Sequence, residues 1–198
     1  MTYDPDEFYD LEAELRRLAT RPAEPDAPPW LYVYDVDVED DPWTYAHRVR
    51  TVLAAAIAIA ATASFDGDPV PVSALPGWFV DVTSRNRGPG SADADFAFRG
   101  ARRYAADQDA PGWDLQDWLY RFDPDAEDRA WRWWDATHAG GGRVRLWVDN
   151  GGEEFIASRD LRWVAFVCGA HIVHEPALER PPAWAAEPST GLPLKPDA

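Results

Sequence analysis

Cysteine and long apolar runs are nearly absent from this chain. Its 198 residues include one cysteine, Cys168, which excludes an intrachain disulfide and a zinc site built from several cysteines. The most apolar stretch, residues 52–63, is mostly alanine, and it is shorter than the roughly 20 residues that a bilayer span needs. We therefore expect a buried helix there and no membrane anchor. The N-terminus lacks the basic and apolar segments of a signal peptide, and with the lone cysteine this predicts a cytoplasmic protein.

Basic residues are also scarce. The chain has 35 acidic and 19 basic residues, which gives a formal net charge of −16. Residues 1–41 hold 13 of the acids and 3 arginines, a local charge of −10. Proteins that bind nucleic acid or anionic lipid need a basic surface. We therefore predict neither kind of partner, and expect the acidic surface to attract a basic protein through long-range electrostatics.

Alternating and helical patterns run through the chain and predict an α+β fold. Residues 30–38 alternate as a strand, with Tyr34 and Val36 on one face and Asp35 on the other. Asp41 can cap a helix that has Pro42 in its first position and continues into the alanine-rich segment. Ile57 and Ile59 alternate, so the last third of that segment can also be read as a strand.

Further elements are expected on both sides of these two. An N-terminal helix is predicted to be capped by Asp4 and to end near Thr20. Later helices are expected at 115–122, from Pro124 to the Gly140–Gly142 run, and at 159–168, and strands at 78–83, 143–148, 153–157 and 171–173. Residues 84–95 are predicted to form a mobile loop.

Together these patterns predict one domain with a mostly antiparallel sheet and helices packed on one side. Residues 1–29 are expected to form an N-terminal helical arm with a proline-rich linker, and residues 30–174 the α+β domain. Residues 175–198 contain six prolines, which is typical of an extended or disordered tail. Trp184 within that tail is expected to dock on the domain or on a partner.

Two groups of residues have spacings that resemble metal sites. Cys168, His171 and His174 are each separated by two residues and could supply a thiolate and two imidazoles to Zn²⁺. However, Cys168 falls on the inward face of a predicted helix, and the odd spacing puts the histidines on opposite faces of a strand. Asp35 and Asp37, with Glu39 beyond, could hold Mg²⁺, but the same carboxylates also suit the solvated face of an edge strand. We favour the structural interpretation of both groups and predict no metal and no cofactor.

Motifs for nucleophilic or phosphate chemistry are missing as well. The sequence contains no G-x-S-x-G and no P-loop, so no catalytic residues are predicted.

Tryptophan, by contrast, is abundant, with 11 residues. Trp131, Trp133 and Trp134 are close in sequence, with Arg129 and Arg132 between or beside them, and Trp and Arg are enriched at binding hot spots. Adjacent helical residues cannot all face the core, so we expect at least one of these indoles to be partly exposed.

The function predicted from these features is protein binding. We expect an acidic inhibitor of the immunity or antitoxin kind, with a basic protein or a second copy of the chain as its partner. The predicted partner-binding residues are the acids Asp35, Asp37, Glu39, Asp40 and Asp41 and the indoles of Trp131, Trp134 and Trp147. A small metal-dependent hydrolase and a structural subunit of a phage or secretion assembly are the alternatives.

Overall fold

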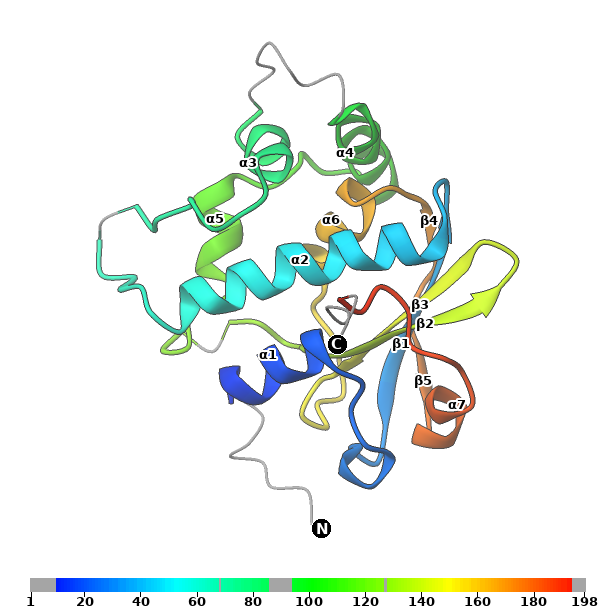
Figure 1. Ribbon diagram of the computed structural model, residues 1–198. Coiled ribbons are helices and arrows are strands. Elements are labelled where there is room, and N and C mark those ends of the chain that lie inside the picture. The colour runs from blue at the N-terminus through cyan, green and yellow to red at the C-terminus, as the bar shows by residue number, and fades with distance from the viewer. Residues whose placement is uncertain (1–9, 68, 86–93, 127, 194–198) are drawn as a thin grey trace, which may run out of the picture.

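A five-stranded antiparallel sheet lies at the centre of the fold. The computed structural model describes residues 10–67, 69–85, 94–126 and 128–193 (Figure 1). The strands are β1 (Leu31–Val38), β2 (Arg132–Gly140), β3 (Arg143–Asp149), β4 (Ala170–Val173) and β5 (Ala177–Glu179). Their order is β2-β3-β1-β4, and β5 also pairs with β1. β1 is therefore the central strand, with β3 along one side and both β4 and β5 along the other.

Seven α-helices and one short 3-10 helix are found in the described residues. They are α1 (Leu11–Ala19), α2 (Pro42–Ala60), α3 (Gly77–Thr83), α4 (Asp95–Gln108), α5 (Leu115–Tyr120), α6 (Arg159–Val167), α7 (Pro181–Ala185) and η2 (Glu24–Asp26). α1 packs against α2 and β2, and α6 packs against β4 and α4. Figure 1 shows α2 crossing the middle of the molecule, with α3 and α4 above it. The α+β class and the antiparallel sheet are confirmed.

The main core lies on the sheet face that carries the even-numbered residues of β1 and β3. Tyr34 and Val36 of β1 lie there beside Leu146 and Val148 of β3, and the helices α2 and α6 cover them. This is the division of faces that alternation in β1 predicts. α2 itself begins as expected, because the Asp41 carboxylate accepts hydrogen bonds from the backbone N–H groups of residues 43 and 44. The helix continues through Ile57 and Ile59, so the alternative of a strand there is wrong.

A smaller cluster lies on the opposite face. Leu31, Val33, Trp134 and Trp147 pack there around Trp184 of α7, whose side chain is fully buried. The expectation of an extended or disordered tail is therefore corrected for the described residues up to 193. Trp184 docks on its own domain, because its indole packs against the apolar side chains on this face of the sheet.

Two predictions of element type are wrong. Residues 78–83, expected as a strand, belong to helix α3. A helix is expected from Pro124 to the Gly140–Gly142 run, but strand β2 lies there instead. β2 forms a hairpin with β3 through Gly141 and Gly142, both at positive φ. The strand expected at residues 153–157 does not form, so no hairpin follows β3 at Gly151 and Gly152.

Among the described residues, the cap of the N-terminal helix is Asp10, which follows the predicted cap, Asp4, in the sequence. The Asp10 carboxylate accepts a hydrogen bond from the Ala13 backbone, and α1 begins at Leu11. The cap predicted at Asp4 lies outside the described residues, and so do residues 86–93 of the mobile loop predicted at 84–95.

Candidate functional site

The predicted partner-binding acids of β1 are paired across the sheet. Asp35 and Asp37 stand directly opposite Arg145 and Arg143 of β3, at 3.0 and 3.1 Å between carboxylate oxygen and guanidinium Nε. The His174 ring nitrogen lies 3.0 Å from the second Asp37 oxygen. Hydrogen bonding by His174, assisted by Arg143, holds the pKa of Asp37 below its ordinary value. Cross-strand pairs of this kind stabilise the sheet modestly, and they leave little net charge for a partner.

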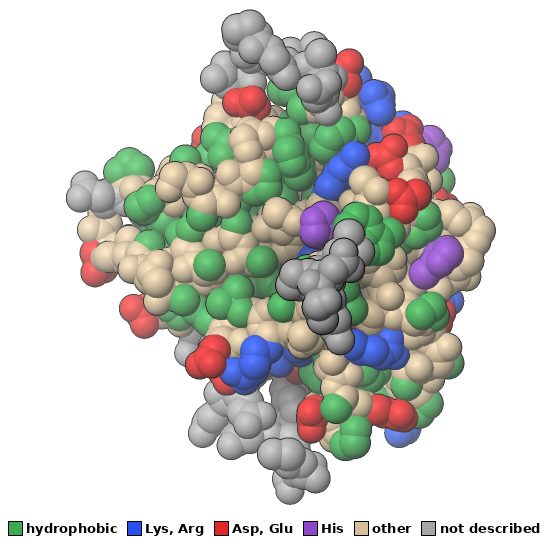
Figure 2. All heavy atoms as spheres, viewed as in Figure 1, with side chains coloured by type: hydrophobic (Ala, Val, Ile, Leu, Met, Phe, Trp, Pro, Cys, Tyr) green, Lys and Arg blue, Asp and Glu red, His purple; other side chains and the backbone are tan. Residues whose placement is uncertain are grey.

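The three acids after β1 are engaged in the same way. Glu39 binds Arg103 and Arg99, which keeps its pKa below the ordinary value, and Asp40 binds Arg48. Asp41 serves as the cap of α2, and its hydrogen bonds at Thr44 lower its pKa. At the upper right of Figure 2, acidic side chains accordingly stand next to basic ones. The acids of residues 35–41 therefore hold the fold together and form no open negative face.

The predicted indole anchors are inside the protein. Trp131, Trp134 and Trp147 are 0%, 4% and 0% exposed, and Trp133 is fully buried as well. The expectation of a partly exposed indole in this group is wrong, because it assumed a helix. In the strand β2, alternate side chains enter the two cores on opposite faces of the sheet. None of these side chains can contact a partner directly.

Cys168 and the two histidines do not come together as a metal site. Cys168 is fully buried, and burial raises the pKa of its thiol. His171 and His174 are exposed and face different carboxylates, Glu39 and Asp37. In the described part of the chain, no three His, Cys, Asp or Glu side chains are placed to hold a metal ion. Likewise, none of the described helices combines the length and apolarity of a membrane span.

A surface that the sequence patterns did not single out has the properties expected of a docking site. Phe155 is 79% exposed, the most exposed of the large apolar side chains that the structure describes, and it follows Glu153 and Glu154 in the loop between β3 and α6. Leu178 of β5 is 47% exposed. The acid–phenylalanine surface, as we name it, comprises Glu153, Glu154, Phe155, Glu175 and Leu178.

Two contacts bring the loop and β5 together. Tyr32 of β1 stands opposite Leu178 in the sheet register, and its hydroxyl donates a hydrogen bond of 3.3 Å to the Glu154 carbonyl. Ile156 and Pro176, which adjoin the two segments, line the same pocket. The loop and β5 therefore belong to one surface.

The carboxylates of this surface are mostly unpaired. Glu153 and Glu154 are exposed and form no ion pair with another described residue. Glu175 is also exposed and lies 3.7 Å from Arg162. The surface thus combines exposed apolar area with negative charge. The only sequence signal for this surface is Glu153-Glu154-Phe155, which lies within the strand predicted at residues 153–157.

Comparison of the chain with protein-family models, with curated proteins and with solved structures finds no match. Candidate functions therefore follow from the surface and pockets of this molecule alone.

Proposed function

We propose that the protein binds a basic protein partner through the acid–phenylalanine surface. The observation that carries this proposal is the 79% exposure of Phe155 beside carboxylates without cationic partners. An aromatic side chain so exposed is costly in water unless a partner covers it, and buried aromatics dominate the energy of interfaces. The net charge of −16 favours a partner of opposite charge. An inhibitor of the immunity or antitoxin kind, acting in the cytoplasm, remains our specific proposal.

The apolar and the acidic residues of this surface are proposed to contribute to binding in different ways. Phe155 and Leu178 supply apolar area that is removed from water on binding, which slows dissociation. Glu153 and Glu154 supply a negative potential that accelerates association at low salt. Neither alternative function predicted from the sequence is supported by a comparable arrangement of the described residues.

The test compares capture of partners from the native host by the wild-type protein and by two variants. Phe155→Ala should weaken binding of a basic partner by about 2 kcal/mol, as expected for a central aromatic anchor. Glu12→Gln, on the exposed side of α1, is the matched control and should bind as the wild type does.

Association kinetics with the purified partner give the second measurement. Replacing Glu153 and Glu154 by glutamine should lower the association rate, and the rate for the wild type should fall as salt is raised. A partner that binds Phe155→Ala as tightly as the wild type, or whose association ignores salt, would refute the proposal.

A further inference from the structure

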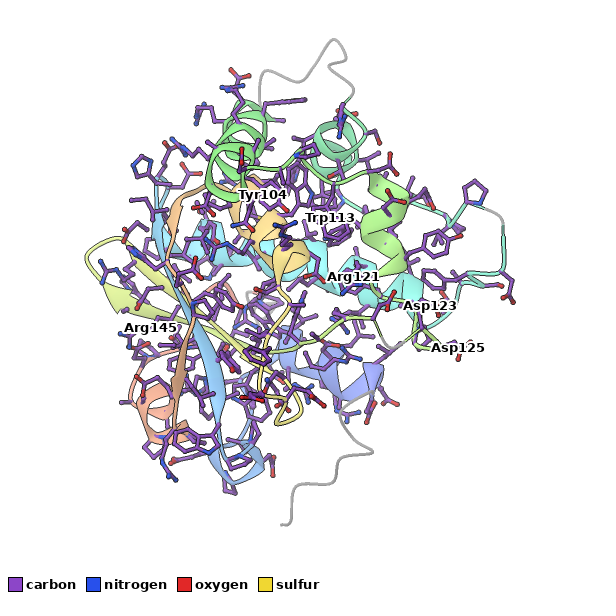
Figure 3. All side chains as sticks on the ribbon, turned by 180° about the vertical axis from the view of Figure 1, so that it is seen from behind. Tyr104, Trp113, Arg121, Asp123, Asp125 and Arg145 are labelled. Atoms are coloured by element: carbon purple, nitrogen blue, oxygen red, sulfur yellow. The ribbon has the colours of Figure 1, made fainter. Side chains whose placement is uncertain are left out.

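A pocket of about 450 Å³ opens at the start of α6. Its walls include Trp113, Arg121, Ile156, Arg159, Asp160 and Glu175. Figure 3 shows Trp113 and Arg121 close to α6 on the side hidden in Figure 1. Pockets for small molecules have volumes of roughly 300–1,000 Å³ and combine apolar walls with a few placed polar groups. The size and the mixed lining of this pocket fit that description.

Asp160 contributes a buried oxygen without a hydrogen-bond donor. Its side chain is 2% exposed, and Oδ1 accepts hydrogen bonds from the Trp131 indole and the Leu161 backbone, both at 3.0 Å. Oδ2 accepts no hydrogen bond from the described residues, and the Arg121 Nε atom lies 3.7 Å away. Burial raises the pKa of this carboxyl. A buried polar atom left without a partner is costly, so the geometry favours a ligand that supplies one.

The charges around the pocket nearly cancel. Arg121 donates to the Asp128 carbonyl, and Arg162 donates to Asp107 at 2.7 Å and to the Val173 carbonyl at 2.8 Å. Arg159 is exposed and has no ion pair among the described residues. Because the lining has cations and carboxylates in similar number, it does not select a strongly charged ligand. It offers both donors and acceptors, which suits hydroxyl groups, since a hydroxyl can donate and accept.

Trp113 is fixed in place at the pocket wall. Its indole N–H is shared between the Tyr104 hydroxyl at 3.1 Å and the Arg159 carbonyl at 3.3 Å. The ring therefore cannot turn that N–H to a ligand, and what it presents to the pocket is apolar surface. An apolar ring next to paired donors and acceptors matches the alternating C–H and O–H groups of a sugar.

We propose that this pocket binds a small neutral polyhydroxyl compound of the monosaccharide class, with Asp160 Oδ2 accepting from one hydroxyl and Arg159 donating to another. The pocket adjoins the acid–phenylalanine surface and shares Glu175 with it, but the sugar is proposed to bind through Asp160 and Arg159, so this proposal does not depend on protein binding at that surface.

The test is titration of the full chain with glucose, galactose, mannose and myo-inositol, followed by ligand-observed NMR and intrinsic tryptophan fluorescence. At least one of these probes should bind saturably. Asp160→Asn preserves the shape but exchanges the accepting oxygen for a donor, and it should weaken binding about tenfold or more. Arg159→Gln, at an exposed position that does not support the fold, should weaken binding without changing the unfolding temperature.

Asp26→Asn, an exposed acid on η2, is the matched control and should bind the sugar as the wild type does. The proposal is overturned if none of the four probes binds, or if binding is unchanged in both Asp160→Asn and Arg159→Gln. Inorganic phosphate serves as the charged probe, and tighter binding of phosphate than of every sugar would overturn the assignment of a neutral ligand.

Discussion

Two carboxylates, Glu14 and Asp135, lie fully buried inside the protein. Glu14 receives two hydrogen bonds from Arg129, at 2.9 and 2.6 Å, and Asp135 receives one from Arg50 at 2.5 Å. Removing one member of such a pair leaves a buried charge without compensation. At the scale of single residues, some of the carboxylates counted in the net charge thus form buried ion pairs, which composition alone does not reveal.

Tyr34 makes the stability sensitive to alkaline pH. Burial raises the pKa of its hydroxyl to about 12, from an ordinary value of 10.0. A folded-state pKa above the unfolded value contributes stability below pH 10 that is lost as the pH rises through 12, here about 3 kcal/mol. Tyr34→Phe should abolish this loss, as measured by urea unfolding at a series of alkaline pH values.

Other buried tyrosines also lose stability at high pH, so the comparison uses the difference between Tyr34→Phe and the wild type. That difference should be constant at neutral pH and should shift in favour of the variant above pH 10. Parallel curves throughout the alkaline range would show that Tyr34 ionises as easily in the folded as in the unfolded chain.

At the scale of elements, the contact between α4 and α6 depends on one glycine. A Cβ atom on Gly100 would lie 1.9 Å from the Phe166 carbonyl oxygen and 2.5 Å from its carbon. In an isolated helix Gly→Ala is stabilising, but here the two backbones would have to separate. We expect Gly100→Ala to destabilise the protein by about 3 kcal/mol or more, measured by chemical denaturation.

Gly77→Ala is the control for this substitution. Gly77 begins α3, and a Cβ atom there would meet nothing within 4 Å. The variant should match the wild type or be slightly more stable. Equal stability of the Gly100 and Gly77 variants would contradict the close packing of α4 on α6.

The elements predicted correctly are those whose residue pattern is specific for a helix or for a strand. α2 carries the Asp41–Pro42 start, and β1 alternates cleanly, so both were predicted. β2 is buried on both faces over residues 132–137, and a strand without a solvated face has no alternation to recognise. Trp133 and Trp134 consequently fit a helical pattern just as well. The apolar run in α3 is equally short and ambiguous.

The candidate site was less predictable than the fold for a related reason. Exposure of Phe155 depends on how residues 153–157 leave the sheet. The pocket at Asp160 is assembled from the end of α4, residues on either side of α5, the loop before α6, α6 itself and the residues after β4. Neither feature leaves a local pattern. Charge counts likewise could not show that Asp35, Asp37 and Glu39 face arginines that lie about 60 to 110 positions away in the sequence.

At the scale of the whole molecule, the C-terminal segment completes the fold. Trp184 fills the cluster on the second sheet face, and its indole donates to Asp135 at 2.8 Å. Trp184→Ala should therefore cost about 3–5 kcal/mol, through the cavity and the lost hydrogen bond. Thermal unfolding and tryptophan fluorescence would measure the effect.

Trp30→Ala is the matched substitution for this experiment. Trp30 is 42% exposed and stacks with Arg180, so its loss should cost only about 1 kcal/mol. If Trp184→Ala lowered the free energy of unfolding as little as Trp30→Ala does, the segment around Trp184 would not be needed for stability.

The position of Asp135 in this network has a consequence for synthesis. Its carboxylate binds Arg50 from α2 and also Trp184 and Ser189, which are synthesised after all five strands. A nascent chain halted before Trp184 therefore has every strand of the sheet available but an uncovered sheet face and a half-satisfied buried charge. Such chains expose apolar surface to chaperones and proteases, so the domain closes only once residues 184–189 have been made.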